Sequence, residues 1–539
     1  MEEYDKLAEP GGNDLTGMLQ DYVIRQGGHR PEAVAIVNEG KAITYGQLDT
    51  LSSRLARVLK KSGCRRGDRV AFLLPKSEMS LAALTGILKA DCAYVPMDCQ
   101  APAAYAATLI SRMEPRVALV DRTYAAFLPR LLETLGSSAP LLGWLDTDSV
   151  SEHGLSPAFD LRDVMNTPDA PVEYENSPDD VAHILFTSGS TGVPKGVMIT
   201  HRNVTAFVEW AVPYFGMDSS DRISTHSHLH FDLSTFDVYG AFAAGARLYP
   251  VPPSLGLSPG ALAGFIRESE LTQWFSVPWV FSYLARLDAL RDHDFPAMKR
   301  VICGGDVLPP PTLVYWMRKV PHASFTNLYG PTETTVASSY YTVPACPEDE
   351  REPVPIGVAC GGEELLVLDD QLRQSPTGEI GDLYIGGVGL SPGYWRDPEK
   401  TREVFIPHPF APGTRLYKTG DLARKGEDGL IRFVGRADTQ VKIRGTRVEL
   451  GEIECALHLL DYLADSAVVA VAAGQTREYA ICCAYSPSPG EDVPPARVHR
   501  DLLERLPRVM IPTRWLSLDA LPRNTNGKTD RPKLRGMFS

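Results

Sequence analysis

Apolar positions repeat along the N-terminal part of the chain first with helical spacing and then in short runs. From Tyr45 to Lys61 the repeat is that of an amphipathic helix, and Thr44 before it is a favourable N-cap residue. Short apolar runs at 70–74 and 93–95 predict buried strands, and residues 81–90 between them predict a helix. Strand and helix patterns alternate onward to about residue 340, which predicts largely parallel α/β sheets.

The next informative stretch runs from Val181 to Val204. Residues 183–186 predict a short buried strand, followed by TSGSTGVPK, which ends at Lys195. Glycines let backbone N–H groups approach an anion, while the hydroxyls add donors and the lysine adds positive charge. This inventory predicts a polyphosphate-binding loop that is not a Walker P-loop. A serine- and glycine-rich surface loop without a ligand is the alternative.

Residues 203–212 predict a helix, and HSHLHFDLSTFDVYGAF follows at 226–242. The three histidines alternate, so on a strand they would share one face. Three such side chains can ligate a metal, but a strand flanking an active site is the better interpretation, because no second shell is evident. Asp232 precedes an apolar helix predicted from Thr235 to Ala244, and its alternative role is to cap that helix.

The bulk composition excludes several classes of protein. The 539 residues predict two to four domains, and a net charge of −13 argues against a general nucleic-acid binder. Nine scattered cysteines without a C-x-x-C pair favour free thiols in the cytoplasm. Residues 1 to about 13 are expected to be disordered and resemble no signal peptide, and no apolar run is long enough to cross a membrane.

Residues 187–197, TSGSTGVPKGV, resemble the phosphate loop of the adenylate-forming superfamily, which comprises acyl-CoA synthetases, firefly luciferase and adenylation domains of nonribosomal peptide synthetases. NLYGPTETT at 327–335, YKTGD at 417–421 and GRADTQVKIRGTRVELGEIE at 435–454 resemble further motifs of that superfamily, in the same order. The resemblance covers about residues 20 to 535.

The resemblance implies an α/β fold with a large N-terminal domain and a small one. The large domain, residues 1–437, would contain α/β subdomains and a distorted β-barrel. A small, mobile α+β domain, residues 438–539, would turn about a hinge at Asp438, where a short polar residue absorbs backbone rotation.

The resemblance also implies that the chain binds ATP and Mg²⁺. Tyr329 would stack on adenine, Thr332 would bond the α-phosphate, and Glu333 would hold Mg²⁺ against it. Asp421 suits the ribose hydroxyls. The full set implied on the nucleotide side is Thr187, Ser188, Gly189, Ser190, Thr191, Gly192, Lys195, Gly304, Gly305, Asp306, Asn327, Leu328, Tyr329, Gly330, Thr332, Asp421, Phe433, Arg436 and Lys528.

The resemblance implies four catalytic residues, namely Thr332, Glu333, Lys442 and Lys528. Lys528, in the turn NGKTD, would bridge the substrate carboxylate and the α-phosphate. Lys442 would act near the second half-reaction, although a solvated charge on a strand edge is its alternative.

Asp232 matches the aspartate that holds the substrate α-ammonium in amino-acid-activating members, where it forms a charge-assisted bond. Apart from Asp232 and Lys528 the aligned pocket wall carries no charge, so it cannot pair a charged side chain. A small neutral amino acid follows, with alanine favoured and proline, glycine or serine as alternatives. The pocket residues are Phe231, Asp232, Leu233, Phe236, Ser276, Val301, Cys303, Leu328, Val336 and Ala337.

The implied activity is formation of aminoacyl-AMP followed by transfer to a phosphopantetheine thiol, in natural-product or antibiotic biosynthesis. Because eleven residues follow Lys528, we expect a stand-alone ligase that loads a separate carrier protein. An acyl- or aryl-CoA ligase using free CoA is the main alternative. A non-catalytic binding paralogue and an enzyme that passes its adenylate to an amine are the others.

Overall fold

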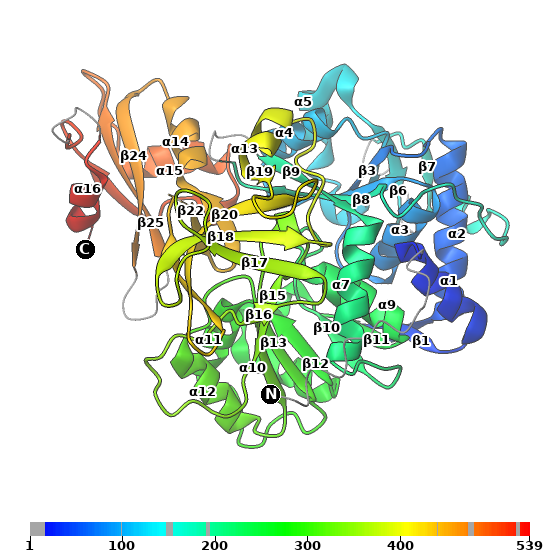
Figure 1. Ribbon diagram of the computed structural model, residues 1–539. Coiled ribbons are helices and arrows are strands. Elements are labelled where there is room, and N and C mark those ends of the chain that lie inside the picture. The colour runs from blue at the N-terminus through cyan, green and yellow to red at the C-terminus, as the bar shows by residue number, and fades with distance from the viewer. Residues whose placement is uncertain are drawn as a thin grey trace.

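The structure is a computed structural model that describes residues 17–98, 100–146, 155–189, 194–438, 440–472, 479–523 and 529–538. Two large sheets make up most of the molecule, a five-stranded antiparallel sheet lies beside them, and smaller C-terminal sheets lie at one end (Figure 1). The α/β fold class predicted from the sequence is confirmed.

The first large sheet has seven strands in the order β7-β6-β5-β3-β4-β8-β9, and every pair is parallel except β8–β9. Its strands are β3 (Arg69–Leu73), β4 (Ala93–Pro96), β5 (Val117–Val120), β6 (Leu141–Trp144), β7 (Phe159–Asp160), β8 (Val181–Thr187) and β9 (Lys195–Thr200). The loop proposed to bind phosphate joins the antiparallel strands β8 and β9 at one edge of this sheet.

The second large sheet has nine strands in the order β16-β15-β14-β13-β12-β10-β11-β1-β2, with a parallel centre and antiparallel edges. Its strands are β1 (Val34–Asn38), β2 (Lys41–Thr44), β10 (Arg222–Thr225), β11 (Arg247–Pro250), β12 (Gln273–Ser276), β13 (Arg300–Gly304), β14 (Ser324–Tyr329), β15 (Ser339–Thr342) and β16 (Val358–Ala359).

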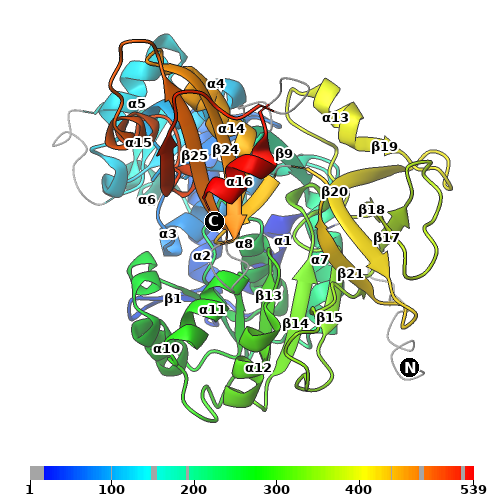
Figure 2. The ribbon, with the colours of Figure 1, turned by 90° about the vertical axis from the view of Figure 1, so that its left-hand side faces the viewer.

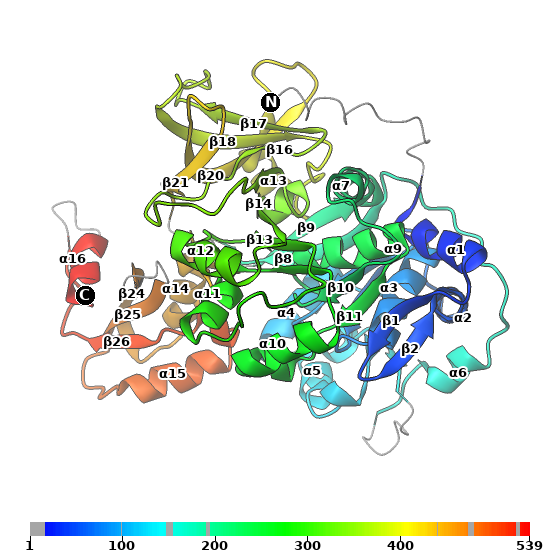
Figure 3. The same cartoon turned by 90° about the horizontal axis from the view of Figure 1, so that it is seen from below.

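The remaining strands form three smaller sheets. The antiparallel sheet holds β17 (Glu363–Leu368), β18 (Ile380–Gly387), β19 (Phe405–Pro407), β20 (Arg415–Lys425) and β21 (Ile431–Arg436). Seen from below, it lies to one side of the two large sheets, with β16 of the nine-stranded sheet next to it (Figure 3). The C-terminal strands are β22 (Gln440–Ile443), β23 (Thr446–Glu449), β24 (Leu463–Ala472), β25 (Tyr479–Pro487) and β26 (Arg514–Ser517).

Helices cover both faces of the large sheets. They are α1 (Leu19–His29), α2 (Tyr45–Lys61), α3 (Glu78–Lys89), α4 (Ala103–Met113), α5 (Leu128–Leu135), α6 (Leu161–Met165), α7 (His201–Tyr214), α8 (Leu233–Thr235), α9 (Ala241–Ala244), α10 (Pro259–Glu268), α11 (Pro278–Arg286), α12 (Pro310–Lys319), α13 (Pro398–Val404), α14 (Leu450–His458), α15 (Pro495–Leu503) and α16 (Arg531–Met537). The predicted helix 45–61 is confirmed, and the Thr44 hydroxyl accepts the Gln47 N–H at 3.3 Å.

The hydrophobic core follows the alternation of side chains along the strands. In β3, Val70 and Phe72 pack into the cluster that contains α2 and α3, whereas Ala71 and Leu73 pack against α4 and α5. The first of these clusters extends from one large sheet to the other. Burial on both faces explains why these strands read as continuous apolar runs in the sequence.

The C-terminal elements have hydrophobic clusters of their own. The buried members of one cluster lie within residues 448–511, and those of the other lie within residues 467–538. Figure 2 shows these elements, among them α14, α15, α16 and β25, in front of the large sheets. The C-terminal elements therefore have hydrophobic cores separate from those of the two large sheets.

Two local predictions are corrected. The alternating histidines do not lie on a strand, because β10 ends at Thr225 and residues 226–232 form a loop. The predicted helix 235–244 contains a π-helical turn, Phe236–Gly240, between α8 and α9. Such turns are frequent at functional sites, and this one begins four residues after Asp232.

Candidate functional site

The candidate site lies where three segments meet: the turn at Asp232, the residues after β14 that include Thr332 and Glu333, and the hairpin 440–449 formed by β22 and β23. The tip of the hairpin packs closely against Val277, which lies just before α11. A Cβ built on Gly445, whose φ is +83°, would lie 2.6 Å from Val277 Cγ1. Glycine is therefore needed both for the backbone conformation and for the close approach.

Asp232 occupies the N-cap position of α8, but its side chain makes no capping hydrogen bond. Instead it accepts a hydrogen bond from Thr332 Oγ1 at 2.6 Å. Desolvation raises the pKa of Asp232, and the Thr332 hydroxyl and the Lys442 ammonium oppose that rise. Lys442 likewise opposes the rise that desolvation causes in the pKa of Asp306. The hairpin lysine thus provides positive charge near two carboxylates.

Glu333 is fully buried and its charge is balanced by the same hairpin. Arg447 Nη1 donates to both carboxylate oxygens of Glu333 at 2.9 Å, and Tyr394 Oη donates to one of them at 2.8 Å. Burial alone would raise the pKa of Glu333, but the Arg447 guanidinium and the Tyr394 hydroxyl hold it below its ordinary value. This carboxylate is therefore ionised.

The first residues of the proposed phosphate loop contact the hairpin and the start of α14. The Ser188 hydroxyl donates to the Arg447 carbonyl at 2.9 Å and accepts the Glu449 N–H at 3.1 Å. The Gly189 N–H donates to Glu452 Oε2 at 3.1 Å. The Gly189 N–H, which the sequence predicts to bind a phosphate, therefore binds the carboxylate of Glu452 in this structure.

Charges of both signs surround Lys195 at the start of β9. Its side chain is buried over the Tyr394 ring, with Nζ 5.6 Å from the ring centre. Burial and then the neighbouring Arg447 lower the pKa of Lys195, while Glu449 raises it. Burial raises the pKa of Glu452 to about 7, and the Gly189 N–H and the charge of Lys195 work against that rise.

A second cluster of polar side chains lies beside the antiparallel sheet. Tyr329 Oη donates to Asp421 Oδ2 at 2.5 Å, and Arg436 Nη1 donates to Asp421 Oδ1 at 2.6 Å. Arg436 also donates to both oxygens of Asp438, at 2.7 and 2.5 Å. The residues predicted for adenine, ribose and hinge thus form one connected network. Phe433 packs near Tyr329 in the same hydrophobic cluster.

Other residues predicted on the nucleotide side lie at the ends of β13 and β14. Gly304 is buried at the end of β13, and Gly305 has a φ of +89°. A Cβ on Gly330 would lie 2.6 Å from the Ala337 Cα, so the backbone there leaves no room for a side chain. Asn327 Nδ2 donates to the Pro355 carbonyl at 2.8 Å, whereas its Oδ1 has no partner among the described residues. Thr187 Oγ1, at the start of the proposed phosphate loop, is also buried without a partner among the described residues.

The sheet separates the predicted pocket residues into two groups. Leu233, Phe236, Leu328, Val336 and Ala337 pack in the cluster that adjoins Asp232 and the half-buried Phe231.

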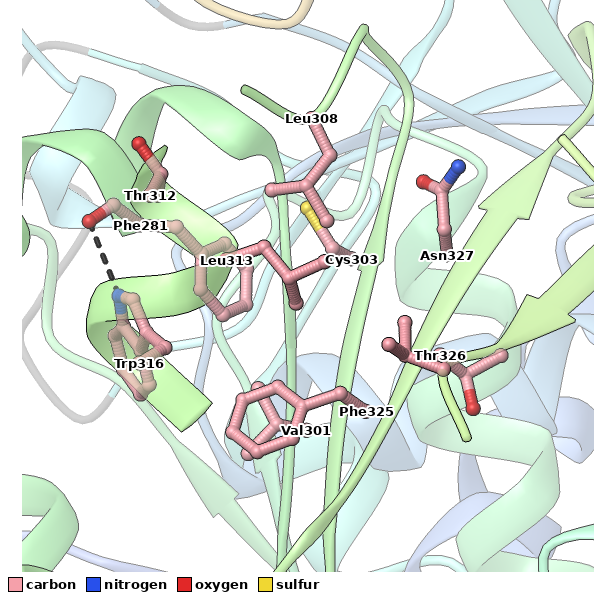
Figure 4. A pocket seen from close by; sticks show the side chains of 11 residues that line it. Phe281, Val301, Cys303, Leu308, Thr312, Leu313, Trp316, Phe325, Thr326 and Asn327 are labelled. Atoms are coloured by element: carbon pink, nitrogen blue, oxygen red, sulfur yellow. Dashed lines mark hydrogen bonds between the residues drawn. The ribbon is translucent and has the colours of Figure 1, made fainter. Parts of the chain in front are cut away.

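Val301 and Cys303 lie on the opposite face of β13 and line a cavity with Phe281, Leu313 and Trp316 (Figure 4). Ser276 is buried at the end of β12, and its hydroxyl lies 3.0 Å from His226 Nδ1.

Four predicted residues lie outside the described residues, namely Ser190, Thr191, Gly192 and Lys528. Conversely, the sequence analysis did not single out Arg447, Glu452, Tyr394 or Lys76. Arg447 and Glu452 belong to the quoted motif 435–454, and Tyr394 lies in the sequence Gly-Tyr-Trp at 393–395, which points to no particular chemistry. Lys76 had no signal, yet its Nζ donates to the carbonyls of Thr225 and His226 at 2.8 and 2.6 Å and so supports the loop before Asp232.

Acid is expected to destabilise the fold through buried neutral histidines. Burial lowers the pKa of His183 to about 3 and that of His201 to about 4. His201 Nδ1 accepts the Leu19 N–H at 3.2 Å, a bond that protonation at Nδ1 would abolish. Because the unfolded state binds protons near pH 6.5 and the folded state does not, stability falls as the pH drops below 6.5.

We expect the free energy of unfolding in urea to fall by roughly 2 kcal/mol or more between pH 7.5 and 5.0. His293→Gln, which alters an exposed histidine, should leave this pH profile unchanged. Equal stability at the two pH values would contradict the assignment of neutral buried histidines.

Residues 23–395 match the family model described as AMP-binding enzyme. Surfactin synthase subunit 2 of Bacillus subtilis (strain 168) is 34% identical over 523 residues, which are 96% of this chain and 14% of that protein. Tyrocidine synthase 1 of Brevibacillus parabrevis is 32% identical over 504 residues, 94% of this chain and 43% of that protein. The chain therefore spans less than half the length of these relatives.

Solved structures resemble the chain over most of its length. The Vibrio cholerae adenylation domain AlmE, in complex with glycyl-adenosine-5′-phosphate, superposes with a TM-score of 0.85 at 26% identity and covers 98% of this chain and 99% of that one. A nonribosomal peptide synthetase protein containing adenylation and PCP domains, bound to a vinylsulfonamide inhibitor, has a TM-score of 0.79 at 26% identity and covers 97% and 84%.

Two features are absent from the part of the chain that the structure describes. No helix there is long and apolar enough to cross a membrane. No group of three or more histidine, cysteine or acidic side chains is arranged there to hold a metal ion.

Proposed function

Because the chain belongs to the AMP-binding enzyme family and is thus an AMP-forming ligase, we propose that it activates a small neutral amino acid with ATP and transfers the aminoacyl group to the phosphopantetheine thiol of a carrier protein. Alanine is the favoured substrate, with glycine, serine or proline as alternatives. The glycyl-adenylate in the structure of the Vibrio cholerae relative supports a small amino acid.

The single observation that carries this proposal is the environment of Asp232. Its carboxylate accepts a hydrogen bond from the Thr332 hydroxyl. The ammonium group of Lys442, on the hairpin 440–449, lies near enough to lower the pKa of Asp232. A substrate ammonium placed there would form a charge-assisted bond to Asp232 and relieve its desolvation. Acids without an amino group would leave this carboxylate without that partner.

The apolar residues beside Asp232 support a short side chain. Phe236 is fully buried and packs edge-on against Phe275 and Phe207, which leaves it little freedom to move aside. Leu233 and Leu328 belong to the same cluster. The cavity beyond β13, lined by Val301 and Cys303, lies on the other face of that strand. A hydrophobic wall of this kind distinguishes acids that differ by one methylene by only about 1–3 kcal/mol, so we propose some promiscuity.

In the first step the substrate carboxylate attacks the α-phosphorus of ATP, and pyrophosphate leaves. Asp232 orients the amino acid through its ammonium, and Thr332 lies within hydrogen-bond reach of Asp232 at the side where the α-phosphate would bind. Tyr329, Asp421 and Arg436 would hold the nucleoside, since they already form one network. A carboxylate needs no general base to become a nucleophile, so positioning and electrostatics account for the catalysis.

Glu333 fits a magnesium ion shared with phosphate oxygens. Its carboxylate is ionised and fully buried, so it requires a cation, and in this arrangement Arg447 provides the charge. Mg²⁺ prefers one or two carboxylates together with phosphate oxygens and waters, which agrees with a single protein carboxylate at this position. When bound, the ion would neutralise charge on the phosphates.

The second step transfers the aminoacyl group to a thiol. We propose that residues 438–539 turn about Asp438 between the two steps, so that Lys528 acts in the first and Lys442 in the second. The clusters confined to residues 441–538 support a separate unit, and the position of Lys442 near Asp232 and Asp306 supports its role in transfer. In this orientation the hairpin 440–449 is inserted into the site.

The test is acid-dependent pyrophosphate release from ATP and magnesium, measured over the twenty amino acids plus benzoate and hexanoate. We expect the highest rate with alanine or with glycine, serine or proline. Asp370→Asn, which alters an exposed residue in the turn after β17, is the control and should show the same acid profile as the unmodified enzyme. Activity confined to benzoate or hexanoate would replace the proposal with an acyl- or aryl-CoA ligase.

A further inference from the structure

Lys76 belongs neither to the residues predicted for the nucleotide nor to those predicted for the substrate, yet it contacts the loop that leads to Asp232. It lies between β3 of the seven-stranded sheet and α3, whose N-cap residue is Ser77. From there its ammonium reaches the nine-stranded sheet and donates to the carbonyls of Thr225 and His226, at 2.8 and 2.6 Å. One side chain thus joins the two large sheets where β10 ends.

The loop 226–232 connects β10 to α8 without regular secondary structure. At its start Lys76 holds the first carbonyl of the loop, and at its end the Phe231 N–H donates to the His228 carbonyl at 3.0 Å to form a turn. Asp232 follows this turn directly. Because Lys76 fixes the direction in which the chain leaves β10, it also determines where the turn and Asp232 lie.

Asp237 carries the negative charge that balances Lys76. It lies in the π-helical turn Phe236–Gly240 and is fully buried, and neither of its carboxylate oxygens has a hydrogen-bond partner among the described residues. Burial raises the pKa of Asp237, and the ammonium of Lys76 opposes that rise. Burial lowers the pKa of Lys76 to about 7, and Asp237 opposes that change in turn. Two opposite charges close together offset part of the cost of burying each one.

Three neutral histidine rings complete the surroundings of Lys76. Burial and then the charge of Lys76 lower the pKa of His226 to about 3 and that of His230 to about 4. The ring of His228, whose pKa burial likewise lowers to about 4, stacks on that of His230 with 5.2 Å between the ring centres. The alternating histidines of the sequence therefore lie around an ammonium group, and their neutrality leaves Asp237 to balance its charge.

We propose that Lys76, with Asp237 as its counter-charge, is a positioning residue that fixes the loop 226–232 and thereby places Asp232 for the substrate ammonium. This inference rests on the proposed function and adds to it two residues that act through Asp232. Without the ammonium of Lys76, the two carbonyls at the end of β10 lose a donor and the loop relaxes. A displacement of about 1 Å in a binding group can cost about 100-fold in rate.

The first test is the KM for the amino acid in pyrophosphate exchange. Lys76→Met keeps the length of the side chain but has neither charge nor donor. The KM for the amino acid should rise at least about 30-fold, whereas kcat and the KM for MgATP stay within about threefold, because only binding of the ammonium is disturbed. Lys76→Arg retains a cation that can donate to both carbonyls and should bring the KM back to within about fivefold of the unmodified enzyme.

Asp237→Asn tests the counter-charge. Alone it should raise the KM for the amino acid about 10-fold, because it leaves Lys76 buried without a balancing charge. Combined with Lys76→Met it should raise the KM no further than Lys76→Met does alone, since both substitutions disrupt one pair. Effects that multiply in the double variant would contradict the pairing of Lys76 with Asp237.

Lys89, at the other end of α3, provides the matched control. It is also a buried lysine, and its ammonium donates to the hydroxyls of Ser52 and Ser53 on α2, at 2.8 and 2.9 Å. Lys89→Met should lower the free energy of unfolding in urea but leave the KM for the amino acid within about twofold. A KM raised equally in both lysine variants would reduce Lys76 to general support of the fold.

Amide hydrogen exchange of residues 226–235 measures the loop independently of activity. It should be at least about 10-fold faster in Lys76→Met than in Lys89→Met or the unmodified enzyme. If an amino acid supports pyrophosphate release and its KM is unchanged in Lys76→Met, the inference is overturned and the proposed function stands. If no amino acid supports release while exchange is faster in Lys76→Met, the proposed function fails and the role of Lys76 in fixing the loop stands.

Discussion

Asp232→Ala should lower kcat/KM for amino-acid activation by about 1,000-fold, which corresponds to roughly 4 kcal/mol of lost interaction with the substrate ammonium. The reason is the environment of this carboxylate. Desolvation disfavours its charged form, and the Thr332 hydroxyl donates a hydrogen bond to it. Removing the carboxylate leaves a desolvated ammonium without a counter-charge. The measurement is amino-acid-dependent exchange of pyrophosphate into ATP.

Asp232→Asn separates charge from shape, because asparagine keeps the size of the side chain and an oxygen that accepts from Thr332. If the ammonium needs the negative charge, Asn is nearly as damaging as Ala. Activity with hexanoate, which has no ammonium, should fall much less in both variants. Near-normal KM and turnover in Asp232→Ala would refute the assignment of this residue to the substrate amine.

Lys442→Ala is expected to slow aminoacyl transfer to the carrier thiol by about 100-fold while leaving adenylate formation within about threefold. In the structure Lys442 lies on the inserted hairpin, where its charge acts on Asp232 and Asp306. If the C-terminal part turns between the steps as proposed, this charge is present for transfer and absent for adenylate formation. Single-turnover rates of the two steps, measured separately, test the expectation.

Lys528→Ala is the reciprocal variant, which should abolish adenylate formation while sparing transfer from preformed aminoacyl-AMP. Lys533→Ala removes an exposed lysine on α16, five residues further along the chain, and is expected to affect neither step. Equal damage to both steps in Lys442→Ala would refute the proposed alternation of the two lysines.

Local structure was largely predictable from the sequence where short-range rules decide it. The helix 45–61 was predicted with its N-cap because the leucine spacing and the Thr44 hydroxyl act within a few residues. The strands at 70–74 and 93–95 were predicted within one residue, because burial on both faces requires apolar runs. The loop at 226–232 was misread as a strand, because an alternation over five residues is too short to distinguish a strand from an irregular loop.

The candidate site shows the same division. Motif resemblance identified Asp232, Thr332 and Glu333, and the structure brings Asp232 and Thr332 within hydrogen-bond distance. It also shows that Val301 and Cys303 lie on the opposite face of β13 from Leu328 and its neighbours, a consequence of side-chain alternation in the sheet.

By itself the sequence determined the fold class, the family and the chemical types of residue available, because propensity, burial pattern and motif spacing are properties of neighbouring residues. Tertiary structure alone decided which charges face one another. The pairing of Arg447 with Glu333 joins residues that are 114 positions apart, and that of Gly189 with Glu452 joins residues 263 apart. Such contacts depend on how two separately packed parts of the chain meet, which no local pattern encodes.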